Sequence, residues 1–146
     1  MAKGEAPKVG QIVRHHFLWS DEKAGGRTER AKARPCIIIA VESRSGDDPP
    51  RVTVLPVTSQ APRPDAAAIA VPDALKARID LDPGRPAWVV IDQANVFTWP
   101  GFDLVPPSNG RFVRGMITSG FFQQIAAAVI ATHTSGRLQR TDRDDT

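Results

Sequence analysis

The sequence has little that would support a disulfide framework or a metal centre. It contains one cysteine, Cys36, and three histidines among 146 residues. A single thiol excludes an internal disulfide, and because Cys36 lies inside an apolar run we interpret it as a core residue in a reducing compartment. No cysteine or further histidine stands at ligand spacing from the pair His15 and His16, so we expect neither a metal nor another cofactor.

Long hydrophobic runs and a strong charge of one sign are also missing. Residues 1–8 lack the apolar segment of a signal peptide, and the longest apolar segment, residues 125–131, is far too short to cross a bilayer. The net charge is only +3, which permits a phosphate-bearing partner without demanding one. With 41% hydrophobic and 24% charged residues, the chain can form one domain with a proper core. We expect a cytoplasmic protein with no membrane partner.

What the sequence does contain is a pair of runs rich in β-branched residues, 34–41 and 52–59, joined by the polar turn 43–50. This pattern predicts a β-hairpin, and the almost uninterrupted apolar character of the first run predicts a central strand covered on both faces. In an antiparallel pair the start of one strand lies beside the end of the next. We therefore expect the guanidinium of Arg34 and the hydroxyl of Thr58 to be neighbours.

Weaker patterns predict the rest of a β-rich domain. Further strands are expected at residues 9–14, 66–71, 87–97 and 102–105, of which the second could instead begin a helix. Asp73 is expected to cap a short helical turn. No internal repeat is evident.

The one substantial helix is expected near the C-terminus. Apolar residues recur at helical spacing from a cap at Thr118 or Ser119 to His133. Residues 136–146 are charged and lack a hydrophobic pattern, so we predict a domain over residues 1–135 followed by a disordered tail. Five or six short strands and one closing helix indicate a mainly β protein, a small and strongly bent antiparallel barrel.

A long loop separates the first two predicted strands. Residues 15–33 show no steady period, and a loop of this length inside a compact domain is more often functional than decorative. Between Lys23 and Arg34 five cations face a single acid, Glu29. Such a basic run is commonly a solvated loop, but its Lys and Arg side chains could also contact phosphates.

Four segments in a fixed order carry a resemblance to a known family. They are Val9-Gly10-Gln11-Ile12-Val13, Arg34-Pro35-Cys36-Ile37-Ile38-Ile39, Val54-Leu55-Pro56-Val57-Thr58-Ser59 and Val90-Ile91-Asp92-Gln93. At these spacings the chain resembles the PemK/MazF family of toxins from bacterial toxin–antitoxin systems. The resemblance implies an SH3-like barrel of the PemK/MazF/CcdB type, usually a homodimer. It also implies that the protein cuts single-stranded RNA without a metal and is neutralised by an acidic antitoxin.

The resemblance also implies which residues act. The arginine of the family's Arg-Pro pair falls on Arg34, the hydroxyl of its Pro-x-Thr strand on Thr58 and the acid of its Asp-Gln pair on Asp92. When a ribose 2′-OH attacks the adjacent phosphate, negative charge builds on oxygens to which Arg34 and Thr58 can donate hydrogen bonds. The candidates for the base that takes the 2′-OH proton are Asp92, His15 and His16.

The residues expected to act on RNA form two sets. The catalytic set is Arg34, Thr58, Asp92 and His16; the RNA-binding set is Arg14, His15, Lys23, Arg27, Arg30, Lys32, Ser59, Gln60 and Trp99. Each has an ordinary alternative: Arg34 could be a surface arginine, Thr58 a hydroxyl bonded to the backbone, and Asp92 a carboxylate that binds a turn. Trp99 could equally close the rim of the barrel.

The chain departs from the family pattern at two positions. Members often carry a cation two residues before the Asp or two after the Gln, where this sequence has Val90 and Asn95. Either the basic loop supplies the missing charge, or catalysis is lost. The alternatives to a nuclease are therefore a non-catalytic SH3-like module that binds RNA or a peptide, and a toxin that acts on a protein target, as gyrase-directed toxins of similar fold are thought to do.

Overall fold

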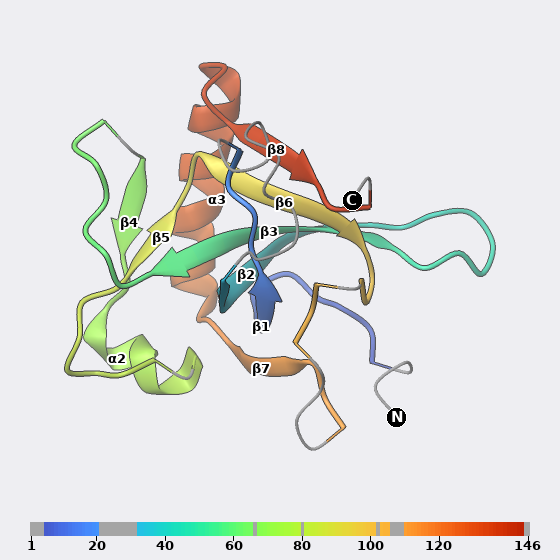
Figure 1. Ribbon diagram of the computed structural model, residues 1–146, viewed down its shortest axis with the longest axis horizontal. Helices are drawn as coiled ribbons and strands as arrows, with labels where there is room; N and C mark the ends of the chain where they lie inside the picture. Colours follow the sequence, from blue (N-terminus) through green and yellow to red (C-terminus); the bar gives the residue numbers. More distant parts are fainter. Residues whose placement is uncertain are drawn as a thin grey trace.

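The computed structural model describes residues 5–20, 32–65, 67–79, 81–101, 103–105 and 110–144. The strands in these ranges are β1 (Gln11–His16), β2 (Ala33–Glu42), β3 (Arg51–Thr58), β4 (Ala68–Ala70), β5 (Trp88–Val90), β6 (Gln93–Thr98), β7 (Val113–Met116) and β8 (Gln139–Asp142). The helices are α2 (Asp73–Lys76), the short 3-10 helix η2 (Ala77–Ile79) and α3 (Ser119–Thr134). Figure 1 shows the strongly bent sheet with α3 lying against it. The expected mainly β protein with a C-terminal helix is confirmed.

The predicted hairpin forms the centre of the sheet. β2 and β3 pair antiparallel, with Cys36 opposite Pro56 and Ile37 opposite Leu55. The pairing ends at Cys36 and Pro56, and Arg34 and Thr58 follow two residues beyond it at the same end of the hairpin. The turn that joins the two strands projects away from the rest of the domain (Figure 1). The hairpin therefore has one end in the body of the protein, where Arg34 and Thr58 lie, and one end in solvent.

The far edge of β3 is shared between two partners. Its first half pairs with β6, so that Val54 lies opposite Asn95, and its end pairs with β5, so that Val57 lies opposite Val89. The prediction of one strand over residues 87–97 is therefore wrong, because the chain bends between β5 and β6 to pass from one part of the sheet to the next. Asp92 lies in this bend.

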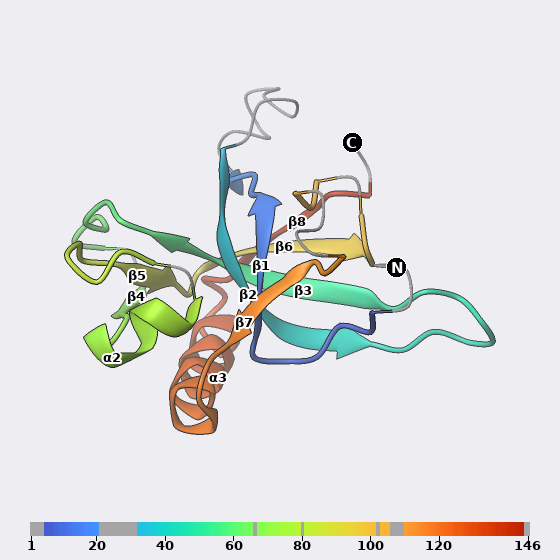
Figure 2. The ribbon, with the colours of Figure 1, turned by 90° about the horizontal axis from the view of Figure 1, so that it is seen from below.

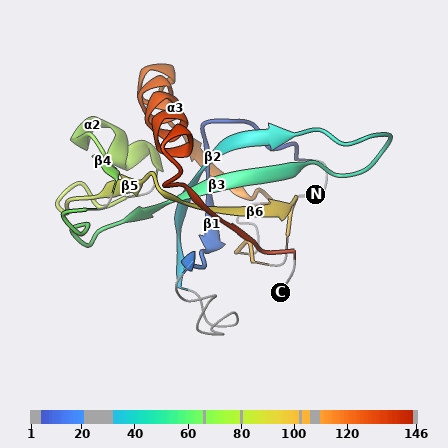
Figure 3. The same cartoon turned by 90° about the horizontal axis from the view of Figure 1, so that it is seen from above.

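The C-terminal segment also differs from the prediction. The sequence predicts a disordered tail over residues 136–146, but residues 139–142 form β8, which pairs in parallel with β6 (Figure 3). Ion pairs hold this polar strand in place: Arg51 contacts Asp142, and Arg143 lies 2.8 Å from Asp103. Because these contacts join distant residues, the local hydrophobic pattern gives no indication of them.

Smaller corrections concern strand and helix ends. Residues 113–116 form β7, which was not expected, at the outer edge of β1. Of the predicted strand at 102–105, residue 102 lies outside the described residues, and residues 103–105 form a single bridge, between Leu104 and His15. Helix α2 begins after Pro72 without a side-chain cap, so Asp73 is its first residue rather than its cap. The cap at Thr118 is confirmed, since its hydroxyl oxygen accepts a hydrogen bond from the backbone N–H of Phe121.

The core occupies both faces of the central strands. Alternation along the strands sends Ile37 and Leu55 to one face, where Ile125 of α3 packs, and sends Cys36 to the other face, beside Phe97. Figure 2 shows α3 lying along one side only. Burial raises the pKa of the Cys36 thiol above its usual range. Cys36 is therefore the inert core residue that the sequence indicates.

Candidate functional site

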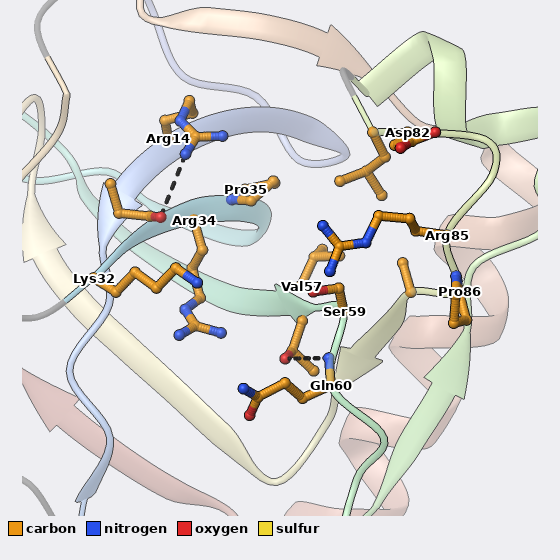
Figure 4. Close-up of a pocket in the computed structure, with 14 residues that line it drawn as sticks. Arg14, Lys32, Arg34, Pro35, Val57, Ser59, Gln60, Asp82, Arg85 and Pro86 are labelled. Carbon is orange, nitrogen blue, oxygen red and sulfur yellow. Dashed lines mark hydrogen bonds between the residues drawn. The ribbon is translucent and has the colours of Figure 1, made fainter.

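A polar cavity opens where β1, the start of β2, the end of β3 and the loop before β5 meet. Its volume is about 480 Å³. The cavity is lined by Arg14, Lys32, Ala33, Arg34, Pro35, Val57, Thr58, Ser59, Gln60, Leu81, Asp82, Arg85, Pro86 and Ala87 (Figure 4). The hairpin thus places both residues of the predicted pair, Arg34 and Thr58, on one cavity wall.

Arg34 is held by an aromatic ring. Its guanidinium carbon lies 5.3 Å from the ring centroid of Trp19, which follows β1. A cation above an aromatic face is attracted by the electrons of the ring, and a planar guanidinium also stacks on it. The ring thus helps to hold the guanidinium at the cavity, and guanidinium N–H groups are the donors that suit an oxyanion.

Thr58 is the last residue of β3. Its hydroxyl oxygen accepts a hydrogen bond of 3.2 Å from the backbone N–H of Gln60, which Figure 4 marks. This bond is the backbone interaction that the sequence analysis gives as the ordinary alternative for Thr58. It occupies the oxygen as an acceptor and leaves the hydroxyl hydrogen to be donated, so the bond orients the group and does not exclude a phosphate contact.

The described lining is strongly cationic. Arg14, Lys32, Arg34 and Arg85 face one carboxylate, Asp82. Arg14 donates a hydrogen bond of 3.3 Å to the carbonyl oxygen of Ala33, the residue that begins β2. Cations gathered around a concave surface raise the local potential and attract phosphates. Asp82 can offset only one of the four positive charges, so the described lining keeps a net positive charge.

The structure brings six of the predicted residues to the cavity, namely Arg14, Lys32, Arg34, Thr58, Ser59 and Gln60. Lys23, Arg27 and Arg30 lie outside the described residues. It does not bring Asp92, His15, His16 or Trp99 to the cavity lining. Four of the nine predicted RNA-binding residues and two of the four predicted catalytic residues thus converge on one place.

His15 is a core residue. Its side chain is fully buried and stacks on Phe97 with ring centroids 4.8 Å apart. Nε2 lies 3.1 Å from Oδ1 of Asn95. Burial lowers the pKa of His15 from 6.5 to about 4, so the imidazole is neutral near pH 7. A buried neutral ring can neither bind a phosphate nor reach a substrate.

The other three residues also have structural roles. The Asp92 carboxylate lies 3.5 Å from the backbone N–H of Ala67, which matches the alternative of an acid that binds a turn. Trp99 is buried, and its indole N–H donates to the carbonyl oxygen of Glu5 at 2.9 Å. His16 is half-buried on β1, and its backbone N–H donates to the carbonyl oxygen of Asp103.

The two departures from the family pattern are both core positions. Val90 is buried, and Asn95 is fully buried with its amide bonded to His15 and to Leu18. Oδ1 of Asn95 accepts from the backbone N–H of Leu18 at 2.9 Å, and Nδ2 donates to the carbonyl oxygen of Leu18 at 2.7 Å. Asn95 therefore fixes the chain after β1. Because position 95 lies in the core, a side chain there cannot supply a charge to the cavity.

Two residues of the site were not found from the sequence. Arg85 lines the cavity from the loop before β5, and Trp19 supports Arg34. The Arg-Pro pair of Arg34-Pro35 recurs at Arg63-Pro64 and at Arg85-Pro86, but Arg63 does not line the cavity, so the pair alone does not identify Arg85. For Trp19 no local signal exists, since its contact with Arg34 depends on the pairing of β1 with β2.

The fold and the cavity define a small β-barrel protein with a cationic site of a size and charge suited to a phosphate-bearing ligand. The sequence matches the model of the PemK-like, MazF-like toxins of type II toxin–antitoxin systems over residues 8–98. The chain belongs to this family. No curated protein and no solved structure matches the chain significantly.

In the ranges that the structure describes, no group of three or more His, Cys, Asp or Glu residues could hold a metal ion. No helix there is long and apolar enough to cross a membrane.

Proposed function

We propose that the protein is an endoribonuclease toxin that cuts single-stranded RNA at the cationic cavity without a metal. The observation that carries the proposal is the meeting of Arg34 and Thr58 on one wall of a cavity whose described lining holds four cations. The family consists of toxins of toxin–antitoxin systems, which supports a substrate whose destruction stops growth. RNA is such a substrate, and it carries both the phosphate and the 2′-OH that the reaction needs.

In the proposed reaction the 2′-OH of a ribose attacks the phosphorus of the next phosphodiester. The new O–P bond forms as the bond to the 5′ oxygen of the following nucleotide breaks; the 2′-OH proton passes to water and the 5′ oxygen takes a proton from water, which leaves a 2′,3′-cyclic phosphate and a 5′-hydroxyl. Arg34 donates hydrogen bonds to the phosphoryl oxygens as their negative charge grows. Thr58, oriented by Gln60, donates one more and keeps the phosphate in line with the attacking oxygen. Asp92 and His16 have no part in this proposal because they lie outside the cavity.

The test is to incubate the purified protein with long single-stranded RNA in the presence of EDTA. We expect cutting with cyclic phosphate ends in wild type. Removal of one preorganised donor costs on the order of 10²- to 10³-fold in rate, so Arg34→Ala and Thr58→Val should each lose activity by at least that lower factor. The variants Arg44→Ala and Thr53→Val are matched controls, since both residues lie on the same hairpin but outside the cavity lining.

Each alternative function gives a different result in this assay. RNA binding without cutting would contradict the enzyme and support a non-catalytic module. Neither binding nor cutting, with toxicity retained in cells, would support a protein target. If Arg34→Ala and Thr58→Val cut as fast as their controls at unchanged thermal stability, the site is misassigned even if the protein is a nuclease.

The proposed partners follow from the charge of the same cavity. An acidic antitoxin would neutralise the cationic lining by complementary charge and would compete with RNA for it. A homodimer and a cytoplasmic location are proposed on the family resemblance, and sedimentation of the purified protein tests the first of these.

A further inference from the structure

Arg85 enters the cavity from a turn that the sequence makes rigid. The turn runs from Asp82 through Pro83 and Gly84 to Arg85, with the Asp and Pro that β-turns favour in their first two positions. Oδ1 of Asp82 accepts from the backbone N–H of Gly84 at 2.8 Å, and its carbonyl oxygen accepts from the backbone N–H of Arg85 at 3.2 Å. Pro86 then restricts the backbone of Arg85 to extended conformations. The side chain is exposed, but its Cα is closely fixed.

A buried lysine holds this turn from behind. Lys76 lies at the end of α2 and is only 4% exposed. Its ammonium donates to the carbonyl oxygen of Arg85 at 2.7 Å and to Oδ1 of Asp73 at 2.7 Å. Removing an ammonium from water is costly unless it is paired and hydrogen-bonded. The carboxylate of Asp73 thus compensates the buried charge of Lys76. The other hydrogen bond of the ammonium fixes the backbone of Arg85.

The position of Arg85 differs from that of the other cations of the cavity. Arg14, Lys32 and Arg34 come from β1 and from the start of β2, whereas Arg85 reaches the cavity from the loop on the other side (Figure 4). Among the described residues the Arg85 side chain makes no ion pair, and Asp82 is engaged by the turn. A single phosphate held at Arg34 and Thr58 would leave the Arg85 guanidinium unused at the opposite wall.

We propose that Arg85 binds a second phosphate of the RNA, adjacent to the one that is cut, and that Lys76 is the positioning residue that holds it there. This inference rests on the proposed function. It gives the cavity two phosphate sites on opposite walls and requires a substrate with consecutive phosphodiesters, so a longer strand is preferred to a dinucleotide with one linkage. Arg85 also supplies a cation to a site where the family positions, Val90 and Asn95, have none.

The test measures binding of a 2′-O-methyl RNA, which lacks the attacking hydroxyl and is not cut. Each phosphate neutralised on a single strand contributes about 0.7 to the slope of log K against log salt. We expect Arg85→Ala to weaken binding roughly tenfold, the loss of one hydrogen bond to a charged group, and to reduce the slope by about 0.7. Arg44→Ala removes the same charge from the exposed turn between β2 and β3 and should change neither quantity as much.

A neutral linkage identifies which phosphate Arg85 binds. A methylphosphonate placed next to the scissile linkage should weaken binding to wild type and leave binding to Arg85→Ala unchanged. Lys76→Met keeps the apolar stem and removes the ammonium; we expect it to weaken binding in wild type and to have no further effect in Arg85→Ala. In steady-state cutting, Arg85→Ala should raise KM more than it lowers kcat, because Arg85 does not touch the reacting phosphorus.

The outcomes separate this inference from the proposed function. If wild type cuts RNA but Arg85→Ala binds and cuts like Arg44→Ala, the second phosphate site is overturned and the nuclease stands. If Arg85→Ala weakens binding but Lys76→Met, folded as judged by thermal unfolding, does not, Lys76 has no positioning role. If wild type neither binds nor cuts RNA, the proposed function fails, and the inference fails with it.

Discussion

Acid should destabilise this protein through one buried histidine. His15 of β1 is fully buried and stacks on Phe97, and the orientation of the Asn95 amide fixes which ring nitrogen of His15 carries the hydrogen. The Asn95 amide nitrogen donates to the Leu18 carbonyl, so its oxygen is an acceptor, and Nε2 of His15 must carry the hydrogen of their 3.1 Å bond. Nδ1 is then the site that would take a proton, and within the described residues it has no hydrogen-bond partner. Protonation would therefore bury an unpaired N–H and a charge.

The size of the effect follows from the pKa. Burial lowers the pKa of His15 from 6.5 to about 4 in the folded protein. Above pH 6.5 the ring is neutral in both states, and its contribution to stability is complete. Between pH 6.5 and about 4 the unfolded chain binds a proton that the folded protein does not, so the free energy of unfolding falls as the pH falls. The full loss is roughly 3 kcal/mol.

The charged groups around His15 partly oppose one another. Asp103 favours the protonated ring, whereas Arg143 and His16 disfavour it. Asp103 and Arg143 form an ion pair of 2.8 Å, so their effects on His15 largely cancel and burial remains the main cause. The prediction therefore depends on the packing around the ring more than on any single neighbouring charge.

Urea unfolding at several pH values between 7.5 and 4.5 measures this loss. Wild type should lose most of the stated free energy across this range, while His15→Gln, which cannot titrate, should start lower and change less. His133→Gln removes an exposed imidazole from α3 and is the matched control. Parallel curves for wild type and His15→Gln would refute the reasoning, because they would show that folding does not depress the pKa of His15.

Two further predictions concern positions that fix the chain around the site. A Cβ at Gly115 of β7 would overlap the carbonyl oxygen of Arg78, whereas one at Gly120 of α3 would meet nothing within 4 Å. In thermal unfolding, Gly115→Ala should therefore lower the free energy of unfolding by about 3 kcal/mol or more, whereas Gly120→Ala should be neutral or slightly stabilising. Asn95→Ala removes three buried hydrogen bonds, so urea unfolding should show a loss of about 3 to 4 kcal/mol in the free energy of unfolding. The control Gln93→Ala should lose clearly less, because the Gln93 amide binds only half-buried Ser20. Equal losses would contradict the role given to Asn95.

The part of the site that could be predicted follows from strand pairing alone. Arg34 and Thr58 lie at facing ends of two strongly apolar runs, and the geometry of an antiparallel hairpin is enough to bring them together. The helix α3 was equally accessible, because its period and its Thr118 cap are local. Where neighbouring residues decide the structure, the sequence is sufficient.

The wrong assignments share a different cause. The predicted first strand ends at residue 14, which leaves His15 in a loop, whereas β1 continues to His16 and its alternation turns His15 inward with Val13. β8 was missed because its residues are polar and its partners, Arg51 and the strand β6, are far away in the sequence. A local pattern cannot show on which side of a sheet a polar residue lies.

The cations of the cavity do not come from positions 90 and 95. The family positions at Val90 and Asn95 are buried here, and a lysine or arginine at either would have to bury its charge against the core. Asn95 instead closes the chain after β1 with three hydrogen bonds, and this same segment carries Trp19, whose ring stacks on Arg34. The hydrogen bonds of Asn95 therefore help to hold the segment that positions Arg34. The positive charge opposite Arg34 comes from Arg85, on a turn held by a buried lysine, where it can point into the cavity without entering the core.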